Sequence, residues 1–225
     1  MTTLTRKVAA TIASVACTAL IVALAGLSLA ENGGSSSDGS DNGRGEVLFA
    51  LCQQCHGSDG GGMELSLAPA IAGLDQWYVQ AQLEKFKAGL RGLHAQDVGG
   101  LRMYPMSQWL ANAEDIAAVS QYVSGLPRLS IESTLEGGDA QKGATSYVLC
   151  ANCHGKEGEG NQQMNSPPLR NMSDWYLMTT MQKFKDGVRG SNVKNPTEMM
   201  MRGMALSLAD EQAVKDVIAH IMTLK

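Results

Sequence analysis

The sequence carries two copies of one short pattern, in which two cysteines separated by two residues are followed at once by a histidine. The copies lie in the segments LCQQCHGSDGGG and LCANCHGKEGEG. Their reactive residues are Cys52, Cys55 and His56, then Cys150, Cys153 and His154. Two thiols one helical turn apart beside an imidazole suit three kinds of chemistry. They can attach a haem covalently, hold a zinc ion, or form a redox-active dithiol.

The spacing and its context favour covalent haem attachment. A zinc site built from the four cysteines would not require a histidine directly after each pair. A thioredoxin-like dithiol lies beside a βαβ unit, and no such pattern surrounds either motif. In the haem signature, the two thiols add to the vinyl groups of one porphyrin and the histidine becomes the proximal iron ligand. The motifs therefore predict two covalently bound haem c groups, whose iron is held by His56 and His154.

The two motifs belong to a duplication that spans most of the chain. When the sequence is shifted by 98 residues, residues 41–127 pair with residues 139–225 without a gap, and 24 of the 87 paired positions are identical. A period of this length is too long for a solenoid repeat and indicates a duplicated domain. We therefore predict two tandem domains, 41–127 and 139–225, joined by an interdomain linker over residues 128–138.

The elements that must position the motifs read as helices, and no stretch alternates with a period of two. A short helix leads into each motif, and the segment DQWYVQAQLEKFKAG places apolar residues on one helical stripe and stops at Gly89. The segment DWYLMTTMQKFKDG is its copy. The last helix of each domain is expected to begin near Asn112 or Asp210, both of which are good N-cap residues. The sequence thus predicts an all-α fold with three or four helices in each domain.

The middle helices share a second repeated pattern, WY…KFK.G.RG, which the haem motif does not explain. Its tryptophans, Trp77 and Trp175, are most simply read as core residues. Lys85, Lys87 and Arg91 are expected to form a solvated helix face, or else to pair with haem propionates or with the carboxylates of a partner.

An iron site that carries electrons needs a second axial ligand, and methionine opposite histidine is typical of c-type cytochromes. The chain has 13 methionines, but after the middle helix only two aligned pairs recur: Met103 with Met201 and Met106 with Met204. His94 and His220 align with Asn192 and Tyr122, which excludes ligation by two histidines in both domains. The residues alone leave open the choice within each pair, and also a plain core-filling role.

With these motifs in hand, residues 41–225 resemble the tandem di-haem class I cytochromes c of the c-four carrier type. The resemblance rests on CQQCH with MYPM and on CANCH with MRGM. It implies that the first methionine of each element, Met103 and Met201, binds iron. It also implies that a prolyl carbonyl orients each imidazole, and that the first and last helices of each domain touch. The prolines would be Pro69 and Pro167, and the touching residues Gly45 and Phe49, then Gly143 and Tyr147.

The N-terminus reads as a targeting or anchoring segment. Arg6 and Lys7 precede an uncharged, mostly apolar run from Val8 to Ala30. Residues 1–30 are therefore expected to be a signal peptide or a membrane anchor, because the run ends in a small-x-small pattern yet is long enough to span a bilayer. Residues 31–40 have the composition of a flexible linker. Either interpretation places the remaining chain in the periplasm, and the second tethers it to the inner membrane.

The charge of the chain indicates which kinds of partner it can bind. The chain has a net charge of -4, which argues against a nucleic-acid partner. The count is five basic and nine acidic residues over 41–127, and ten basic and nine acidic over 139–225, so the two domains differ in sign. The expected function is electron transfer between redox proteins, such as a quinol-oxidising complex and a terminal oxidase or reductase. The alternatives are a fixed electron-entry subunit of a membrane enzyme and, less favoured because it needs an open iron position, a di-haem peroxidase.

Overall fold

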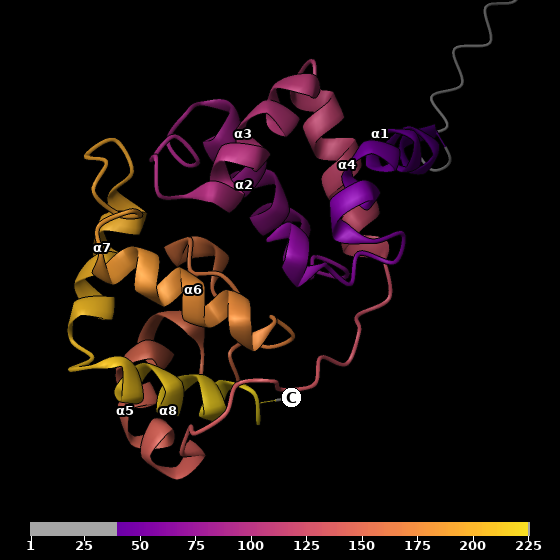
Figure 1. The fold of residues 1–225 in the computed structure, drawn as a ribbon. Coiled ribbons are helices and arrows are strands. Elements are labelled where there is room, and N and C mark those ends of the chain that lie inside the picture. The colour runs from indigo at the N-terminus through magenta and orange to yellow at the C-terminus, as the bar shows by residue number, and fades with distance from the viewer. Residues whose placement is uncertain (1–39, 225) are drawn as a thin grey trace, which may run out of the picture. The chain divides into compact units, whose positions relative to one another are not determined.

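The computed structural model describes residues 40–224, and the expected signal or anchor segment and most of the linker after it lie outside the described residues. The first half comprises α1 (Ser40–His56), the short 3-10 helix η1 (Glu64–Ser66), α2 (Gln76–Lys87), α3 (Val98–Trp109) and α4 (Ala113–Gly125) (Figure 1). The second half repeats this order with α5 (Ala140–His154), η2 (Gln162–Met164), α6 (Asp174–Lys185), α7 (Pro196–Leu206) and α8 (Glu211–Ile221).

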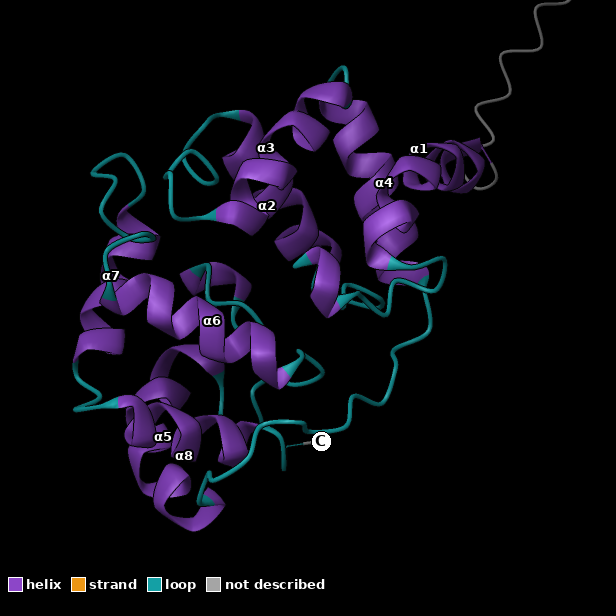
Figure 2. Ribbon diagram, in the orientation of Figure 1, coloured by secondary structure: helices purple, strands orange, loops and turns teal. Residues whose placement is uncertain are grey.

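The described part of the chain is built from helices and loops, which confirms the all-α prediction (Figure 2). Within residues 40–224 the extended pairing is limited to two isolated bridges, Met63 with Ala68 and Asn161 with Ser166. Each bridge closes the loop that follows a Cys-x-x-Cys-His motif. Among the described helices, none has both the length and the apolar character needed to cross a membrane.

The first and last helices of each half cross at a glycine. A side chain at Gly45 would clash with the carbonyl oxygen of Ala118, so only glycine allows α1 to approach α4 this closely. One turn later, the ring of Phe49 lies 5.2 Å from that of Tyr122. The copy is closer still, because a Cβ at Gly143 would overlap the carbonyl oxygen of Asp216.

This geometry agrees with the helix contact that the family resemblance implies. In the second half, the ring of Tyr147 on α5 lies 5.0 Å from that of His220 on α8. The crossing holds the helix that bears each haem motif against the helix with the largest buried apolar face, which in the second half is lined by Val214, Val217, Ile218 and Ile221.

The expected helix starts are also observed. The side chain of Asn112 accepts a hydrogen bond from the backbone N–H of Asp115 at 2.9 Å, and Asp210 accepts one from Ala213 at 2.8 Å. These are N-cap contacts of the usual kind. By contrast, the sequence did not locate α3 and α7, the helices that carry the candidate methionines. α3 contains Pro105 and two glycines near its start, which is a poor helical pattern, and its cap at Asp97 compensates by accepting from the N–H of Gly100.

The segment between the halves is fastened at both ends. Arg128 donates from Nε to the carbonyl oxygen of Gly73 at 2.9 Å and pairs with Asp75 at 3.1 Å. At the other end, the buried carboxylate of Asp174 accepts hydrogen bonds from the side chains of Ser133 and Thr134 and from the backbone N–H groups of Thr134 and Leu135. The segment between α4 and α5, called the strap below, is therefore held against both halves.

Candidate functional site

Each motif histidine is buried and held by one carbonyl. The Nδ1 of His56 donates to the backbone oxygen of Pro69 at 2.8 Å, and His154 makes the same bond to Pro167 at 2.8 Å. A carbonyl only accepts, so the proton must sit on Nδ1, which leaves the lone pair of Nε2 free for a metal. Burial lowers the pKa of His56 more than the Pro69 carbonyl raises it, and the imidazole is therefore neutral at pH 7.

The glycines after each motif bring the proline loop within reach of the histidine. At Gly62, which has a φ of +84°, a Cβ would lie 2.5 Å from the backbone nitrogen of Ala70 and 2.6 Å from the carbonyl carbon of Pro69. Gly160 is equivalent, because a Cβ added there would lie 2.6 Å from the backbone nitrogen of Pro168. Both positions need a left-handed backbone and bare Cα, which is why the sequence repeats glycine here.

The environment of the thiols does not suit a redox-active dithiol. Cys52 is partly buried at the end of α1, and desolvation, together with the nearby Cys55, raises its pKa to about 11 although a backbone hydrogen bond lowers it. Burial likewise raises the pKa of Cys150. Reactive dithiols instead need a depressed pKa. The zinc alternative also lacks support, because within residues 40–224 no three His, Cys, Asp or Glu side chains gather as they would around one ion.

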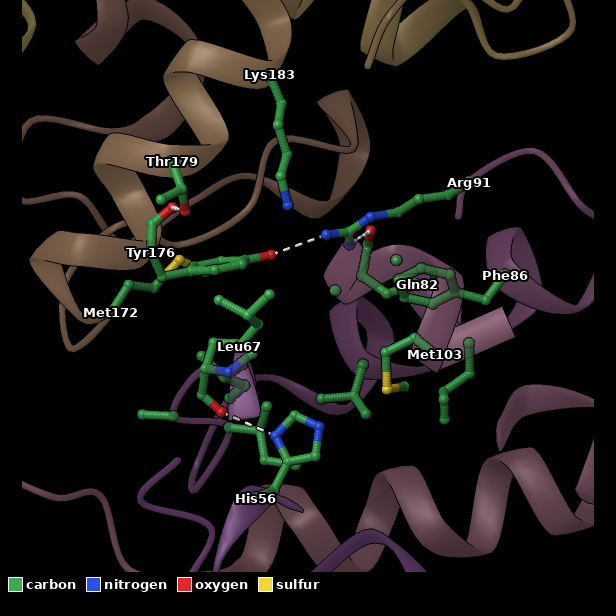
Figure 3. Close-up of a pocket in the computed structure, with 18 of the residues that line it drawn as sticks. His56, Leu67, Gln82, Phe86, Arg91, Met103, Met172, Tyr176, Thr179 and Lys183 are labelled. Carbon is green, nitrogen blue, oxygen red and sulfur yellow. Dashed lines mark hydrogen bonds between the residues drawn. The ribbon is translucent and has the colours of Figure 1, made fainter. Parts of the chain in front are cut away.

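The first cavity lies in front of His56. It has a volume of about 260 Å³, and its walls are mainly apolar, with Ile71, Leu83 and Phe86 among them. Figure 3 shows that His56 and Met103 both face this cavity. Met106, the other methionine of the same element, is 40% exposed and does not line it. The geometry of the first half therefore favours Met103, one of the two residues that the repeat had singled out.

The second cavity is smaller, about 150 Å³, and is lined by Cys150, Cys153 and His154. Three methionines of α7 line it: Met200, Met201 and Met204. Met200 is 62% exposed and Met204 is 37% exposed, whereas Met201 is partly buried. Met201 is thus the least exposed of the three methionines, and it is also the one that the duplication aligns with Met103.

The two cavities share walls. Four side chains line both of them: Tyr78, Gln82, Met172 and Tyr176. The first cavity is completed by residues of α6, among them Trp175, Tyr176 and Lys183, and the second by residues of α2, among them Lys85. Each site is therefore finished by the other half of the chain.

This arrangement corrects the expectation that Lys85 and Arg91 belong to a solvated helix face. The Nη2 of Arg91 donates to the hydroxyl of Tyr176 in the other half at 3.0 Å, and its Nη1 donates to Gln82 at 2.8 Å (Figure 3). Lys85 donates to the hydroxyl of Thr197 in the other half at 3.3 Å. Lys87 turns back to the carbonyl of Leu110. Lys85 and Arg91 of the repeated pattern, and Tyr176 and Lys183 of its copy, thus contact the opposite half.

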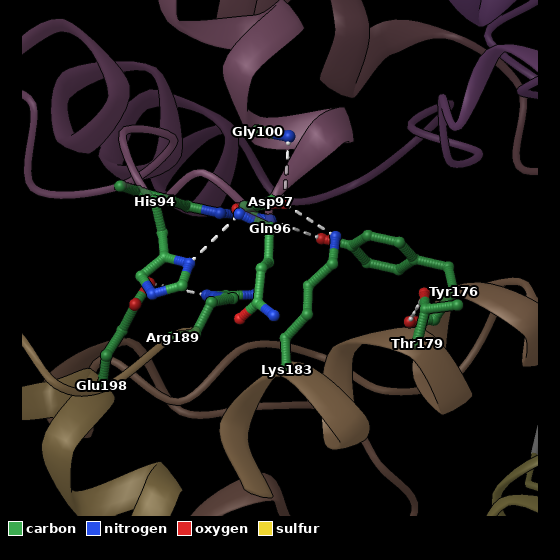
Figure 4. Close-up of polar contacts among 10 residues, drawn as sticks. His94, Gln96, Asp97, Gly100, Tyr176, Thr179, Lys183, Arg189 and Glu198 are labelled. Carbon is green, nitrogen blue, oxygen red and sulfur yellow. Dashed lines mark hydrogen bonds and ion pairs between the residues drawn. The ribbon is translucent and has the colours of Figure 1, made fainter. Parts of the chain in front are cut away.

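Two buried carboxylates in this contact were missed from the sequence. Asp97, 2% exposed, accepts from Lys183 at 2.8 Å, and Glu198 accepts from Arg189 at 2.6 Å (Figure 4). They do not occupy equivalent positions, since the repeat aligns Asp97 with Asn195 and Glu198 with Gly100. A search for recurring residues therefore could not find them.

A covalent haem fits these cavities. Each cavity is lined by an imidazole with a free Nε2 and by a methionine from α3 or α7. The two cysteines of each motif lie on the helix that ends at that histidine, and Cys150 and Cys153 also line the second cavity. In addition, the Nε atoms of Arg91 and Arg189 are buried and have no hydrogen-bond partner in the part of the chain that the structure describes. Buried unpaired donors of this kind suit the acidic substituents of a porphyrin, since an unmet buried donor is costly.

The fold and the paired sites define the class of protein: a c-type cytochrome with two haem-binding units in tandem. The chain belongs to the cytochrome c family, whose pattern matches residues 43–127 and again residues 140–225. It binds two haem c groups, one at each Cys-x-x-Cys-His motif, and acts as an electron carrier of the cytochrome c4 kind.

Individual relatives agree with this assignment. The chain is 30% identical over 183 residues to cytochrome c4 of Stutzerimonas stutzeri, an alignment covering 76% of this chain and 83% of that one. It is 29% identical over 182 residues to a protein of Stutzerimonas stutzeri strain A1501 named thiosulfate dehydrogenase electron acceptor, covering 76% and 78%. Its structure resembles that of the thiosulfate dehydrogenase TsdBA from Marichromatium purpuratum, with a TM-score of 0.65, 28% identity and 82% of this chain covered. This chain spans only 40% of the TsdBA chain.

Proposed function

We propose that four residues in each half hold one haem. Two thioethers, a histidine and a methionine make up each set: Cys52, Cys55, His56 and Met103, then Cys150, Cys153, His154 and Met201. The free Nε2 of each histidine and the place of each partly buried methionine in the same cavity as that histidine support these sets. We also propose residues 41–127 and 139–225 as the two domains.

Bound haem iron supplies one-electron chemistry, and the protein sets the conditions for it. Pro69 and Pro167 fix the planes of the imidazoles. Apolar side chains such as Leu83 and Phe86 line the first cavity and would limit the access of water to a haem bound there. A methionine ligand raises the reduction potential relative to a second histidine. If Met103 and Met201 bind iron as proposed, neither site would keep a position for a peroxide, which argues against the peroxidase alternative.

We propose that the protein carries electrons in the periplasm between a quinol-oxidising complex and a terminal oxidase or reductase. The observation that carries this proposal is the common wall of Tyr78, Gln82, Met172 and Tyr176, because only side chains separate one site from the other. An electron accepted at one half can therefore pass to the other without leaving the chain. The difference in charge between the halves supports a separate partner for each, since charge steers encounter.

A reconstitution experiment tests the proposed partners. Membranes that contain both complexes are washed free of soluble cytochromes, and the purified holoprotein is added back. We expect quinol-dependent oxygen uptake to return in proportion to the protein added. A thiosulfate dehydrogenase is the second donor to test in the same assay, given the relative named as its electron acceptor. A holoprotein that is reduced by neither donor would contradict the proposal.

We propose further that residues 8–30 remain as an inner-membrane anchor with residues 31–40 as its tether, the apolar length of the first being the support. N-terminal sequencing of the mature protein decides this, since a soluble periplasmic chain starting at Glu31 would show cleavage. Extraction in mild detergent then separates a tethered carrier from a fixed subunit of a larger enzyme. A carrier is expected to leave the membrane alone, and a fixed subunit to co-purify with its complex.

A further inference from the structure

A lysine of the second half reaches the first cavity. Lys183 lies on α6, yet it lines the cavity of His56 and Met103, and its Nζ pairs with Asp97 Oδ1 at 2.8 Å. Asp97 is the N-cap residue of α3, the helix that carries Met103. Figure 4 shows Lys183 and Tyr176 extending together from α6 towards Asp97 and Gly100 of the first half.

The first half returns the same contact. Lys85, which the duplication aligns with Lys183, lies on α2 and lines the cavity of His154 and Met201. Its Nζ donates to the hydroxyl of Thr197 at 3.3 Å, and Thr197 lies on α7, the helix that carries Met201. Each methionine-bearing helix therefore receives a lysine from the opposite half.

The chemistry of such a charge follows from its position. Reduction adds an electron to the iron site, so a nearby cation stabilises the reduced state, and it does so more strongly inside a protein than in water. Burial is a further lever on the potential of a haem. Asp97 offsets part of this effect in the first half. Burial raises the pKa of Asp97, but the hydrogen bond and charge of Lys183 lower it further, so the carboxylate is ionised at neutral pH.

We propose that each haem has its reduction potential set in part by a lysine of the opposite half, Lys183 for the first-half site and Lys85 for the second-half site. This inference rests on the two-haem carrier and the proposed ligand sets, and not on the identity of the partners. It makes the two halves mutually dependent in their electronic properties as well as in their packing. It also assigns a role to the first lysine of each repeated KFK segment.

A redox titration of the holoprotein tests the proposal. Lys183→Met is expected to lower the potential of the first-half haem and leave the other nearly unchanged, and Lys85→Met is expected to do the reverse. Replacement of Met103 or Met201 by His identifies which wave belongs to which half, because histidine ligation lowers the potential. Lys194→Met serves as the matched control, since Lys194 is exposed and lines neither of these cavities, and it should shift neither wave.

The direction in which the reduction potential shifts supplies a second test. Asp97→Asn keeps the cap but removes the negative charge, so it should raise the potential of the first-half haem. The double variant Lys183→Met with Asp97→Asn should return that potential towards the parent value. If the single variants keep two low-spin six-coordinate haems and neither potential moves, or if Lys183→Met moves only the second-half wave, the tuning is wrong while the carrier function stands. Should Lys183→Met fail to load haem, Asp97→Asn and Lys85→Met decide the question alone.

Discussion

At the scale of single residues, each iron site depends on a proton held in a fixed place. His56 and His154 give their Nδ1 protons to the carbonyls of Pro69 and Pro167, and this leaves one nitrogen of each ring to bind a metal. The opposite ligand is less constrained, because α3 and α7 each carry more than one methionine. Exposure separates them in the first half, where Met103 lines the cavity and Met106 faces solvent.

Replacing Met103 with Ala should therefore remove one of two thioether ligands. We expect the weak thioether-to-iron charge-transfer band of the oxidised protein to fall to about half, because one of two methionine-bound sites is lost. The remaining iron in that half should become high-spin or take a substitute ligand. Absorption spectroscopy checks both changes. Met106→Ala is the matched control and should leave the band intact, and the opposite result would move the ligand to Met106.

At the scale of elements, each half is closed by a helix crossing that admits no side chain at its centre. α1 and α4 meet at Gly45, and α5 and α8 meet at Gly143. The motif lies at the end of the first helix of each pair, so the crossing sets the direction in which the histidine points. A change that disturbs the helix crossing is therefore expected to move the histidine ligand as well.

Gly45→Ala should destabilise the first half, because the new methyl group would press on the carbonyl of Ala118. Overpacking of this kind costs about 1–3 kcal/mol of unfolding free energy. Gly43 lies in the same helix, and a methyl group there would have nothing within 4 Å, which makes it a matched control. Gly43→Ala should instead stabilise by about 0.5–1 kcal/mol through helix propensity. Denaturant unfolding followed by circular dichroism in the far ultraviolet compares the two, and equal effects would refute the close crossing.

The strap between the halves should give the protein an acid-sensitive contact. Burial raises the pKa of Asp174, but hydrogen bonds from Leu135, Ser133 and Thr134 lower it further, so the folded value lies below the ordinary 3.8. A carboxyl with a depressed folded pKa stabilises fully above its unfolded pKa, and this contribution is lost as the pH falls through the folded value.

Asp174→Asn should therefore unfold more easily than the parent at pH 7, and the difference between the two proteins should shrink as the pH falls below about 4. Denaturant unfolding of both holoproteins across pH 3–7 measures this difference directly, and subtraction cancels titrations that they share. A difference that stays constant over the whole range would show that the carboxylate is not the titrating partner of the strap.

Particular residues show how far the sequence could lead. Cys-x-x-Cys-His is a local pattern with one dominant chemistry. The duplication narrowed the methionines to two aligned pairs, and only the family resemblance pointed to Met103 and Met201 and to the two prolines. The caps at Asn112 and Asp210 were equally readable, since an N-cap acts over only three residues. The helices over 98–109 and 196–206 were not located. In the first of them, Pro105 and the two glycines near the start make a poor helical pattern. Asp97 and Glu198 escaped because each half draws its buried carboxylate from a different position.

At the scale of the whole molecule, the two halves form one unit whose sites interlock. Tyr78, Gln82, Met172 and Tyr176 belong to both cavities, and Arg91 bonds across to Tyr176. Net charge differs between the halves although their folds repeat. The molecule therefore combines internal similarity at the iron sites with different outer surfaces.

The stoichiometry of haem follows from the two motifs. Intact-mass spectrometry of the purified protein should show the polypeptide plus two haem masses, which survive acid–acetone extraction because the links are covalent. The variant with Ala at positions 150 and 153 should retain one haem mass, and its pyridine haemochrome should fall by about half since one of two attachment sites is gone. A parent protein with a single haem mass would refute the assignment of both motifs.

The exchange of walls between the two halves also bears on how such a chain changes through descent. A duplicated gene product usually frees one copy to drift, since the other preserves the original activity. Here a substitution at Lys85 or Lys183 changes the lining of the cavity in the opposite copy, so neither copy can vary independently of the other. The copies nevertheless differ in net charge, and their buried carboxylates, Asp97 and Glu198, stand at positions that do not correspond. Recombination that replaced one half alone would combine residues of two lineages in each cavity, because each cavity is lined by side chains from both halves.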